Sequence, residues 1–211
     1  MNFAAAIFDL DGTLIESNSV WAKIDRIVLE KRGIRCSEDF ANKLSSMTYE
    51  DAAEEMHKLG VTESTESLIK EFNELAVKEY RYNIFLKDHA GEYLEYLKDQ
   101  GIRIALATAS PRELYEPVLR HNRVYGYFDA FCTTNEAGKS KDHPDVYLMA
   151  ASKLGVSPIE CAVFEDVLKG IISAKNAGMT AIGVYDRYSS EDIITIRAAA
   201  DKFIMDFLEM M

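Results

Sequence analysis

The sequence predicts an α/β fold, in which a Rossmann-like, doubly wound parallel sheet carries an inserted all-helical domain. Apolar runs of strand length alternate with helical stretches through most of the chain, which is typical of a parallel sheet covered on both faces. One segment of roughly 70 residues near the start is helical throughout and interrupts this order. The 211 residues are enough for one such core and one smaller insert.

Four apolar runs are expected to form strands of the sheet. Each run is continuous rather than alternating, as expected for a strand that is buried on both faces. The runs cover residues 4–10, 102–107, 161–164 and 180–184. Helical patterns follow at 91–100, 113–121, 145–154 and 169–177. Gly101, Gly155 and Gly178 stand just after three of these patterns, where glycine commonly ends a helix.

The helical insert lies between the first strand and the rest of the sheet. Its helical patterns cover residues 20–31, 38–44, 49–59 and 64–81. We expect residues 1–16 and 87–211 to form the sheet domain and residues 17–86 to form the helical domain. The insert is too long for an ordinary loop, so we expect it over the carboxyl ends of the strands, where open α/β sheets bind ligands. The two chain crossings would then act as a hinge.

Composition and charge exclude several classes of protein. The chain has 24 basic and 35 acidic residues and a net charge of −11, which argues against a nucleic-acid partner. No apolar run approaches the roughly 20 residues that span a bilayer, and the first ten residues lack the basic region of a signal peptide. Cys36, Cys132 and Cys161 form no CxxC pair, which indicates free thiols. We therefore expect a cytoplasmic protein without a membrane partner, as a monomer or weak dimer.

The first candidate site follows the first strand directly. Asp9 and Asp11 bracket one residue, so an extended chain would point both carboxylates the same way. Gly12 permits a tight turn, and Thr13 adds a hydroxyl. An EF-hand loop starting at Asp9 is excluded, because its sixth and twelfth positions hold leucine and valine here. The two carboxylates repel each other, and a cation between them would remove that cost.

Three more polar clusters follow later elements of the predicted sheet. Thr108, Ala109 and Ser110 come after the second strand, and Ser110 is expected to cap the next helix. Lys139 and Lys141 precede a helix, and on composition alone they are equal candidates. A final pair of acids ends the strand at 161–164; these are Glu165 and Asp166. Because the carboxyl ends of parallel strands lie at one edge of the sheet, we expect the clusters to lie close together. Their carboxylates, hydroxyl and lysine are the groups that phosphoryl transfer requires.

These motifs, in this order, resemble those of the haloacid dehalogenase superfamily. The run from Phe8 to Ser17 is a specific match to the family's DxDGT motif, and a threonine, a lysine before Pro-Asp, and Glu-Asp follow in register. The chain looks most similar to the branch with β-phosphoglucomutase and small sugar-phosphate phosphatases. The resemblance implies a Rossmann-like core with a helical cap of the C1 type.

The resemblance also implies roles for the site residues. Asp9 would be the nucleophile, and Asp11 would protonate the leaving oxygen and then activate water. Thr108 and Lys141 would hold the phosphoryl group, and the family's spacing to Pro-Asp selects Lys141 over Lys139. Substrate contacts would come from Gly12, Thr13, Ala109 and Ser110 in the core and from Thr48 and Tyr49 in the cap.

The resemblance implies Mg²⁺ as cofactor. The ion would be held by the carboxylates of Asp9 and Asp166 and the backbone carbonyl of Asp11, with Glu165 as a ligand or directly behind them. Two positions depart from the family: Asp142 stands where proline is frequent and Val167 where serine is frequent. Because a valine side chain cannot hydrogen-bond, some support behind the site would be missing.

The expected reaction is Mg²⁺-dependent hydrolysis of a small phosphate monoester, such as a sugar or polyol phosphate, through an aspartyl-phosphate. Asp11 favours a phosphate ester, since an alkoxide leaving group benefits from a proton donor and a halide does not. An isomerase that moves a phosphoryl group within a sugar phosphate is the alternative. Such an isomerase needs a second cationic group to bind a second phosphate. Tyr49 stands where the mutase has arginine, although Lys23, Arg26 or Lys43 could supply that cationic group instead.

A receiver-like phospho-signalling domain is the alternative outside enzymes. It would use a similar set of acids, a hydroxyl and a lysine on a parallel sheet, but it has no helical insert of this length after its first strand.

Overall fold

The computed structural model describes residues 3–45, 47–187 and 193–211 and divides into two compact units. One unit comprises Met1–Glu16 and Ile84–Met211, and the other comprises Ser17–Asn83. The chain thus returns from the helical unit to the sheet unit between Asn83 and Ile84, slightly before the boundary at residue 86 that the sequence predicts. The reason is local pairing, because the backbone N–H of Glu16 donates to the carbonyl of Phe85 at 3.0 Å and Leu86 forms a bridge to Ile15.

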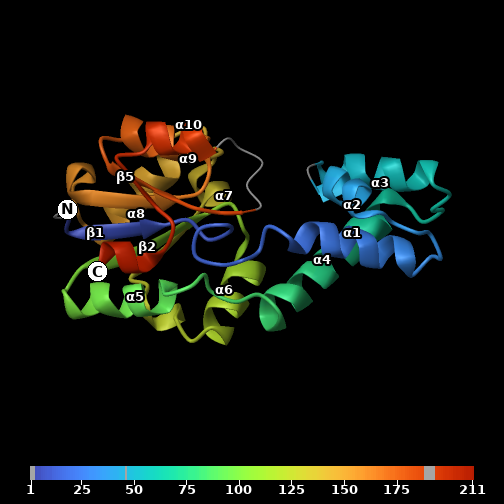
Figure 1. Ribbon diagram of the computed structural model, residues 1–211, viewed down its shortest axis with the longest axis horizontal. Helices are drawn as coiled ribbons and strands as arrows, with labels where there is room; N and C mark the ends of the chain where they lie inside the picture. Colours follow the sequence, from blue (N-terminus) through green and yellow to red (C-terminus); the bar gives the residue numbers. More distant parts are fainter. Residues whose placement is uncertain (1–2, 46, 188–192) are drawn as a thin grey trace. The chain divides into compact units, whose positions relative to one another are not determined.

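The first unit contains a six-stranded parallel sheet in the order β3-β2-β1-β4-β5-β6 (Figure 1). The strands are β1 (Ala5–Phe8), β2 (Arg103–Thr108), β3 (Ala130–Thr133), β4 (Cys161–Glu165), β5 (Thr180–Val184) and β6 (Lys202–Ile204). Phe8 of β1 pairs with Leu106 of β2 on one side and with Phe164 of β4 on the other. The loops after these three central strands therefore leave the sheet at one edge. The predicted doubly wound parallel sheet is confirmed.

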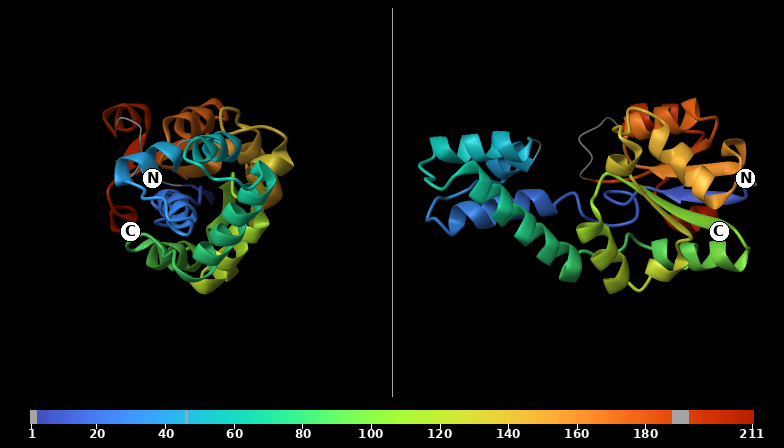
Figure 2. Two further views of the ribbon diagram at one scale, coloured as in Figure 1. Left: turned by 90° about the vertical axis from the view of Figure 1, so that its right-hand side faces the viewer. Right: turned by 180° about the vertical axis from the view of Figure 1, so that it is seen from behind.

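Helices cover both faces of this sheet (Figure 2). Helices α8 (Asp145–Leu154), α9 (Leu168–Asn176) and α10 (Ile193–Ala199) pack on the face that includes Ile7 and Val163. Helices α5 (Ala90–Asp99) and α6 (Arg112–His121) lie on the other face, and the short α7 (Thr134–Ala137) follows β3. On the α5 side, Phe8 stacks on Phe164 with ring centroids 4.5 Å apart. Ile7 and Phe8 thus face opposite ways, as the pleat of a strand requires.

The second unit consists of four helices. They are α1 (Val20–Glu30), α2 (Glu38–Ser45), α3 (Tyr49–Lys58) and α4 (Thr65–Tyr82). Thr48 caps α3 and Ser64 caps α4, each through a side-chain oxygen that accepts a backbone N–H of the first turn. Leu68, Phe72 and Ala76 are buried at helical spacing along α4, so the unit has an apolar core of its own. Within the described part of the chain, no helix is long and apolar enough to cross a membrane.

Candidate active site

Asp9 lies at the edge of the sheet where β1 ends. Its backbone N–H donates to the carbonyl of Phe164 at 3.0 Å, and its side chain is buried. Burial raises the pKa of the Asp9 carboxyl well above its usual range, while the ammonium of Lys141 opposes this rise by donating a hydrogen bond to Asp9 Oδ1. Lys139, the other lysine of that loop, lies instead beside Asp145 at 3.4 Å and is exposed. Lys141 is therefore the lysine that reaches the first motif.

A cluster of three buried carboxylates forms where β1 and β4 end. Asp9, Glu165 and Asp166 each offer one carboxylate oxygen, and these atoms all lie within 4.8 Å of one another. Thr13 Oγ1 donates to Asp166 Oδ1 at 3.0 Å, which links the two loops. Burial and the neighbouring Glu165 charge raise the pKa of Asp166 to about 7. Three acids held this close are stable as carboxylates only with positive charge beside them.

Glu165 connects the lysine to the acid cluster. Its Oε1 accepts hydrogen bonds from Lys141 Nζ at 2.5 Å and from the Tyr147 hydroxyl at 2.7 Å. Its Oε2 is buried and has no hydrogen-bond partner among the described residues. With all three acids ionised, three carboxylates beside one ammonium would leave an excess of two negative charges, and the raised pKa values of Asp9 and Asp166 reflect this crowding. The charge, the orphaned oxygen and the all-oxygen donor set fit a divalent cation such as Mg²⁺.

Two hydroxyls connect the second strand to the first motif. Thr108 is fully buried at the end of β2, and its Oγ1 accepts the backbone N–H of Ser110 at 2.9 Å. Ser110 Oγ donates to Asp11 Oδ2 at 2.7 Å. The expectation that Ser110 caps the next helix is therefore wrong. Helix α6 has Pro111 at its N-cap without a side-chain cap, because the serine hydroxyl is used by Asp11 instead.

The residues expected to contact substrate fall into both units. Gly12 has a φ of 80°, a left-handed conformation that glycine adopts without strain, in the loop that also contains Thr13. Ala109 lies in the loop after β2. Thr48 and Tyr49 belong to the helical unit. There, the Thr48 hydroxyl donates to Asp51 Oδ2 at 2.8 Å in addition to capping α3.

The departure from the family at Val167 affects the N-terminus of α9. Val167 is the N-cap residue of this helix, and it provides no side-chain hydrogen bond. A serine at that position would supply an oxygen to the first turn. The expected loss of support behind the fourth motif is thus a missing helix cap.

Several residues that shape the site belong to none of the sequence motifs. Tyr147 holds Glu165, and the only available signal was a tyrosine on the buried face of α8. Lys87 is buried and donates to Asp186 Oδ2 at 2.8 Å, and the Asp186 charge contributes to the raised pKa of Asp166. No sequence signal pointed to this pair, since its members are 99 positions apart.

Gly170 of α9 makes room for the Glu165 carboxylate. A Cβ atom at this position would lie 2.5 Å from Glu165 Cδ. The carboxylate cannot simply rotate away, because Lys141 and Tyr147 hold it. Glycine at this position of the helix is therefore explained by a close approach.

Gly170→Ala is expected to destabilise the protein by about 1–3 kcal/mol through overpacking against Glu165. The drop should appear in thermal unfolding as a lower midpoint temperature. Gly126→Ala is the matched control, because its added Cβ would meet no atom within 4 Å. Equal stability of the two variants would contradict the proposed role of Gly170.

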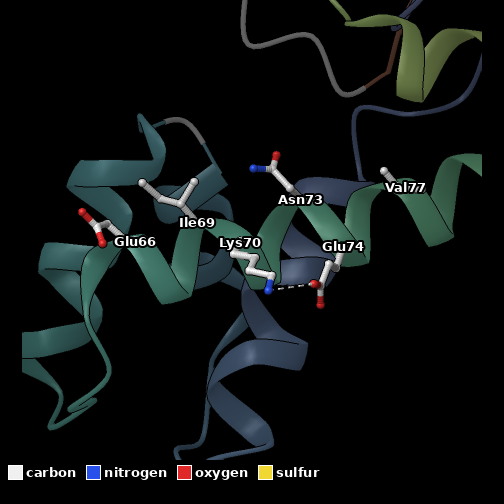
Figure 3. A pocket seen from close by; sticks show the side chains of 6 residues that line it. All are labelled: Glu66, Ile69, Lys70, Asn73, Glu74 and Val77. Atoms are coloured by element: carbon white, nitrogen blue, oxygen red, sulfur yellow. Dashed lines mark ion pairs between the residues drawn. The ribbon is translucent and has the colours of Figure 1, made fainter.

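A groove on α4 has different chemistry. Figure 3 shows the side chains that line it, which are Glu66, Ile69, Lys70, Asn73, Glu74 and Val77. Lys70 and Glu74 are exposed and lie 4.0 Å apart. The groove has no buried acid, and a single exposed ion pair contributes little. It lacks the groups that phosphoryl transfer needs.

Comparisons with known proteins agree with the geometry. A family model described as haloacid dehalogenase-like hydrolase matches residues 6–184. The chain is 34% identical over 187 residues to hexitol phosphatase B of Escherichia coli, covering 85% of this chain and 82% of the relative. It is 30% identical over 188 residues to β-phosphoglucomutase of Bacillus subtilis, with the same coverage of 85% and 82%. Among solved structures, a HAD hydrolase of family IA from Entamoeba histolytica superposes with a TM-score of 0.77 at 30% identity, covering 97% of this chain and 94% of that one.

Proposed function

The chain belongs to the haloacid dehalogenase-like hydrolases and is an enzyme, and from that premise we propose that it hydrolyses a small phosphate monoester. The substrate class is a sugar or polyol phosphate, as the names of the relatives suggest. The observation that carries the proposal is the buried Asp9 carboxylate, held by the Lys141 ammonium, beside an Asp11 carboxylate fixed by Ser110. This arrangement supplies a nucleophile and a separate proton-transfer group.

The proposed reaction has two steps. In the first, an Asp9 carboxylate oxygen attacks phosphorus, the ester bond to the alcohol breaks, and Asp11 gives its proton to the leaving oxygen. In the second, Asp11 takes a proton from water, the water oxygen attacks the aspartyl-phosphate, and inorganic phosphate leaves Asp9. Lys141 and Thr108 hold the phosphoryl oxygens during both steps.

Mg²⁺ is the proposed cofactor. Asp9, Glu165 and Asp166 would hold it, together with the backbone carbonyl of Asp11 that the family resemblance implies. When bound, the ion neutralises the charge of the carboxylates and of the phosphate oxygens. The protein residues then position the ester and move the protons.

Asp166→Asn is expected to weaken Mg²⁺ binding by about tenfold or more, since it replaces a charged ligand with a neutral amide. Calorimetric titration of the substrate-free protein with MgCl₂ measures this without reference to turnover. Asp142→Asn removes an equal charge from an exposed position and should leave the affinity unchanged. If both variants bind Mg²⁺ like the wild type, Asp166 is not a ligand.

Hydrolysis is favoured over isomerisation by the side chain at position 49. Tyrosine cannot form the two-pronged hydrogen bonds that arginine gives to a second phosphate. The test is ³¹P NMR of the enzyme with Mg²⁺ and a panel of hexose, hexitol and glycerol phosphates. Release of inorganic phosphate is expected, whereas conversion of one sugar phosphate into another without release would establish the isomerase. A cytoplasmic location and a monomeric or weakly dimeric state remain predictions.

A further inference from the structure

The helical unit contains a small pocket, and the described residues that line it all belong to this unit. The pocket has a volume of about 160 Å³ and is lined by residues of α1, α2, α3 and α4 and by Met47 between α2 and α3. A cavity of about 150 Å³ holds a benzene molecule, so this one can take a compact group of a few heavy atoms. Its walls include Asp25 of α1 and three aromatic side chains.

Asp25 is the unusual member of the pocket lining. Its side chain lines the pocket although the residue is only 6% exposed. No described residue forms a hydrogen bond or ion pair with it. Burial raises the pKa of Asp25 to about 7, because the charged form loses its hydration, and a cation beside the carboxyl would favour that charged form. A buried carboxylate without a partner is costly, and a positive ligand would offset that cost.

Aromatic rings form the rest of the wall. The ring centroids of Trp21 and Tyr49 are 5.9 Å apart with planes inclined at 56°, and those of Tyr49 and Phe72 are 5.6 Å apart at 39°. Apart from these rings and Asp25, the described residues that line the pocket have apolar side chains. Inclined aromatic faces beside a carboxylate favour organic cations, because the ring faces attract positive charge.

We propose that this pocket binds an alkylammonium group, whose charge pairs with Asp25 and whose carbon atoms contact Trp21, Tyr49 and Phe72. A polyol fits less well, because its several hydroxyls would meet too few polar partners. A phosphate would be repelled by Asp25, and the described lining residues include no lysine or arginine. A bare metal ion would lack the oxygen ligands it needs.

The ammonium group could have two sources. It could be an amino group on the alcohol part of the phosphate ester, which narrows the proposed sugar or polyol class to aminated members, and in that case the inference rests on the proposed function. It could also belong to a separate small amine. Both sources require the same pocket chemistry, so binding is tested first and turnover second.

Choline and its neutral, isosteric analogue 3,3-dimethyl-1-butanol are the probes for binding. Trp21 is the only tryptophan of the chain, so its fluorescence reports on the pocket directly. Choline should change the fluorescence saturably, and it should bind about tenfold or more tighter than the neutral analogue. Equal binding of the two probes, or no saturable change with choline, would overturn the proposal.

Asp25→Asn tests the charge, and Glu54→Gln on exposed α3 surface is the matched control. We expect the first to weaken choline binding by about tenfold or more and the second to leave it unchanged. If Asp25→Asn does not fold, the pair Tyr49→Phe and Tyr49→Leu is used instead. Tyr49→Phe keeps an aromatic ring and should still bind choline, whereas Tyr49→Leu should not. Unchanged choline binding in Asp25→Asn, or in Tyr49→Leu, would refute the site.

Turnover distinguishes the two sources. If the ammonium belongs to the substrate, phosphoethanolamine should have a higher kcat/KM than 2-hydroxyethyl phosphate, and Asp25→Asn should remove that preference while aryl phosphate hydrolysis persists. Choline binding without such a preference assigns the pocket to a separate amine. Choline binding by a protein that hydrolyses no phosphate ester would refute the proposed function and keep the site. Aryl phosphate hydrolysis without choline binding would refute the ammonium site and leave the proposed function standing.

Discussion

Asp9→Asn is expected to lower phosphate-ester hydrolysis by at least about a thousandfold, because the amide is not a nucleophile toward phosphorus. The variant should fold, since asparagine has the same shape and Lys141 keeps its second carboxylate partner, Glu165. Initial rates of phosphate release in the presence of Mg²⁺ measure the loss. Acid quenching of the wild type during turnover should trap a phosphorylated protein, and the variant should show none.

The control for Asp9→Asn is a neutralised acid elsewhere in the same unit, on its surface. Glu136→Gln fits, because Glu136 is exposed and forms its ion pair with Lys153, at a distance of 2.8 Å. It should hydrolyse the same esters at nearly the wild-type rate. A variant at position 9 with more than about a tenth of the wild-type rate would mean that another group attacks phosphorus.

The central strands were predictable because burial on both faces gives a continuous apolar run. All four residues of β1 are buried, and β4 is buried along its whole length. The edge strands β3 and β6 were not predicted. They have four and three residues, and both alternate or vary in burial, so no run of strand length stands out. Edge strands in this protein are defined by their neighbours in the sheet rather than by their own sequence.

The site was predictable where it depends on strand ends and not where it depends on side-chain packing. The pairing of the adjacent parallel strands β1 and β4 brings Asp9 and Glu165 to one edge of the sheet, independently of the conformation of the loops that follow. The hydrogen bond of Tyr147 to Glu165 depends instead on how α8 packs under the sheet. Ser110 shows the same limit, because a helix cap and a hydrogen bond to Asp11 are equally compatible with the sequence.

The helical unit shows where periodicity stops being informative. No sequence pattern singled out Asp25 of α1, although this acid is buried. Its side chain faces aromatic residues from α3 and α4, and only the tertiary packing of those helices decides which face of α1 is covered. The helices themselves could be read from the sequence, but the pocket among them could not.

Asp11→Asn is expected to slow hydrolysis of alkyl phosphates by about 10²–10⁴-fold, the usual range for loss of a general acid and base. Asparagine can still accept the hydrogen bond of Ser110 through its amide oxygen, so the loop after β1 should keep its place. What is lost is the proton for the leaving alkoxide and the base that activates water. Rates for a sugar phosphate and for 4-nitrophenyl phosphate, measured side by side, separate these two functions.

The leaving group decides how the Asp11→Asn defect divides between the steps. 4-Nitrophenolate leaves without a proton donor, so the first step should survive with this ester and the second should not. The variant should therefore give a burst of nitrophenol and then stall as phosphorylated protein, whereas sugar phosphates should react slowly from the start. Ser110→Ala, which only releases the carboxylate from its hydrogen bond, should cost about tenfold or less with both esters. If Asp11→Asn slows both esters equally and shows no burst, Asp11 positions the substrate and transfers no proton, and the acid for the leaving oxygen must be sought among the other groups at this edge of the sheet.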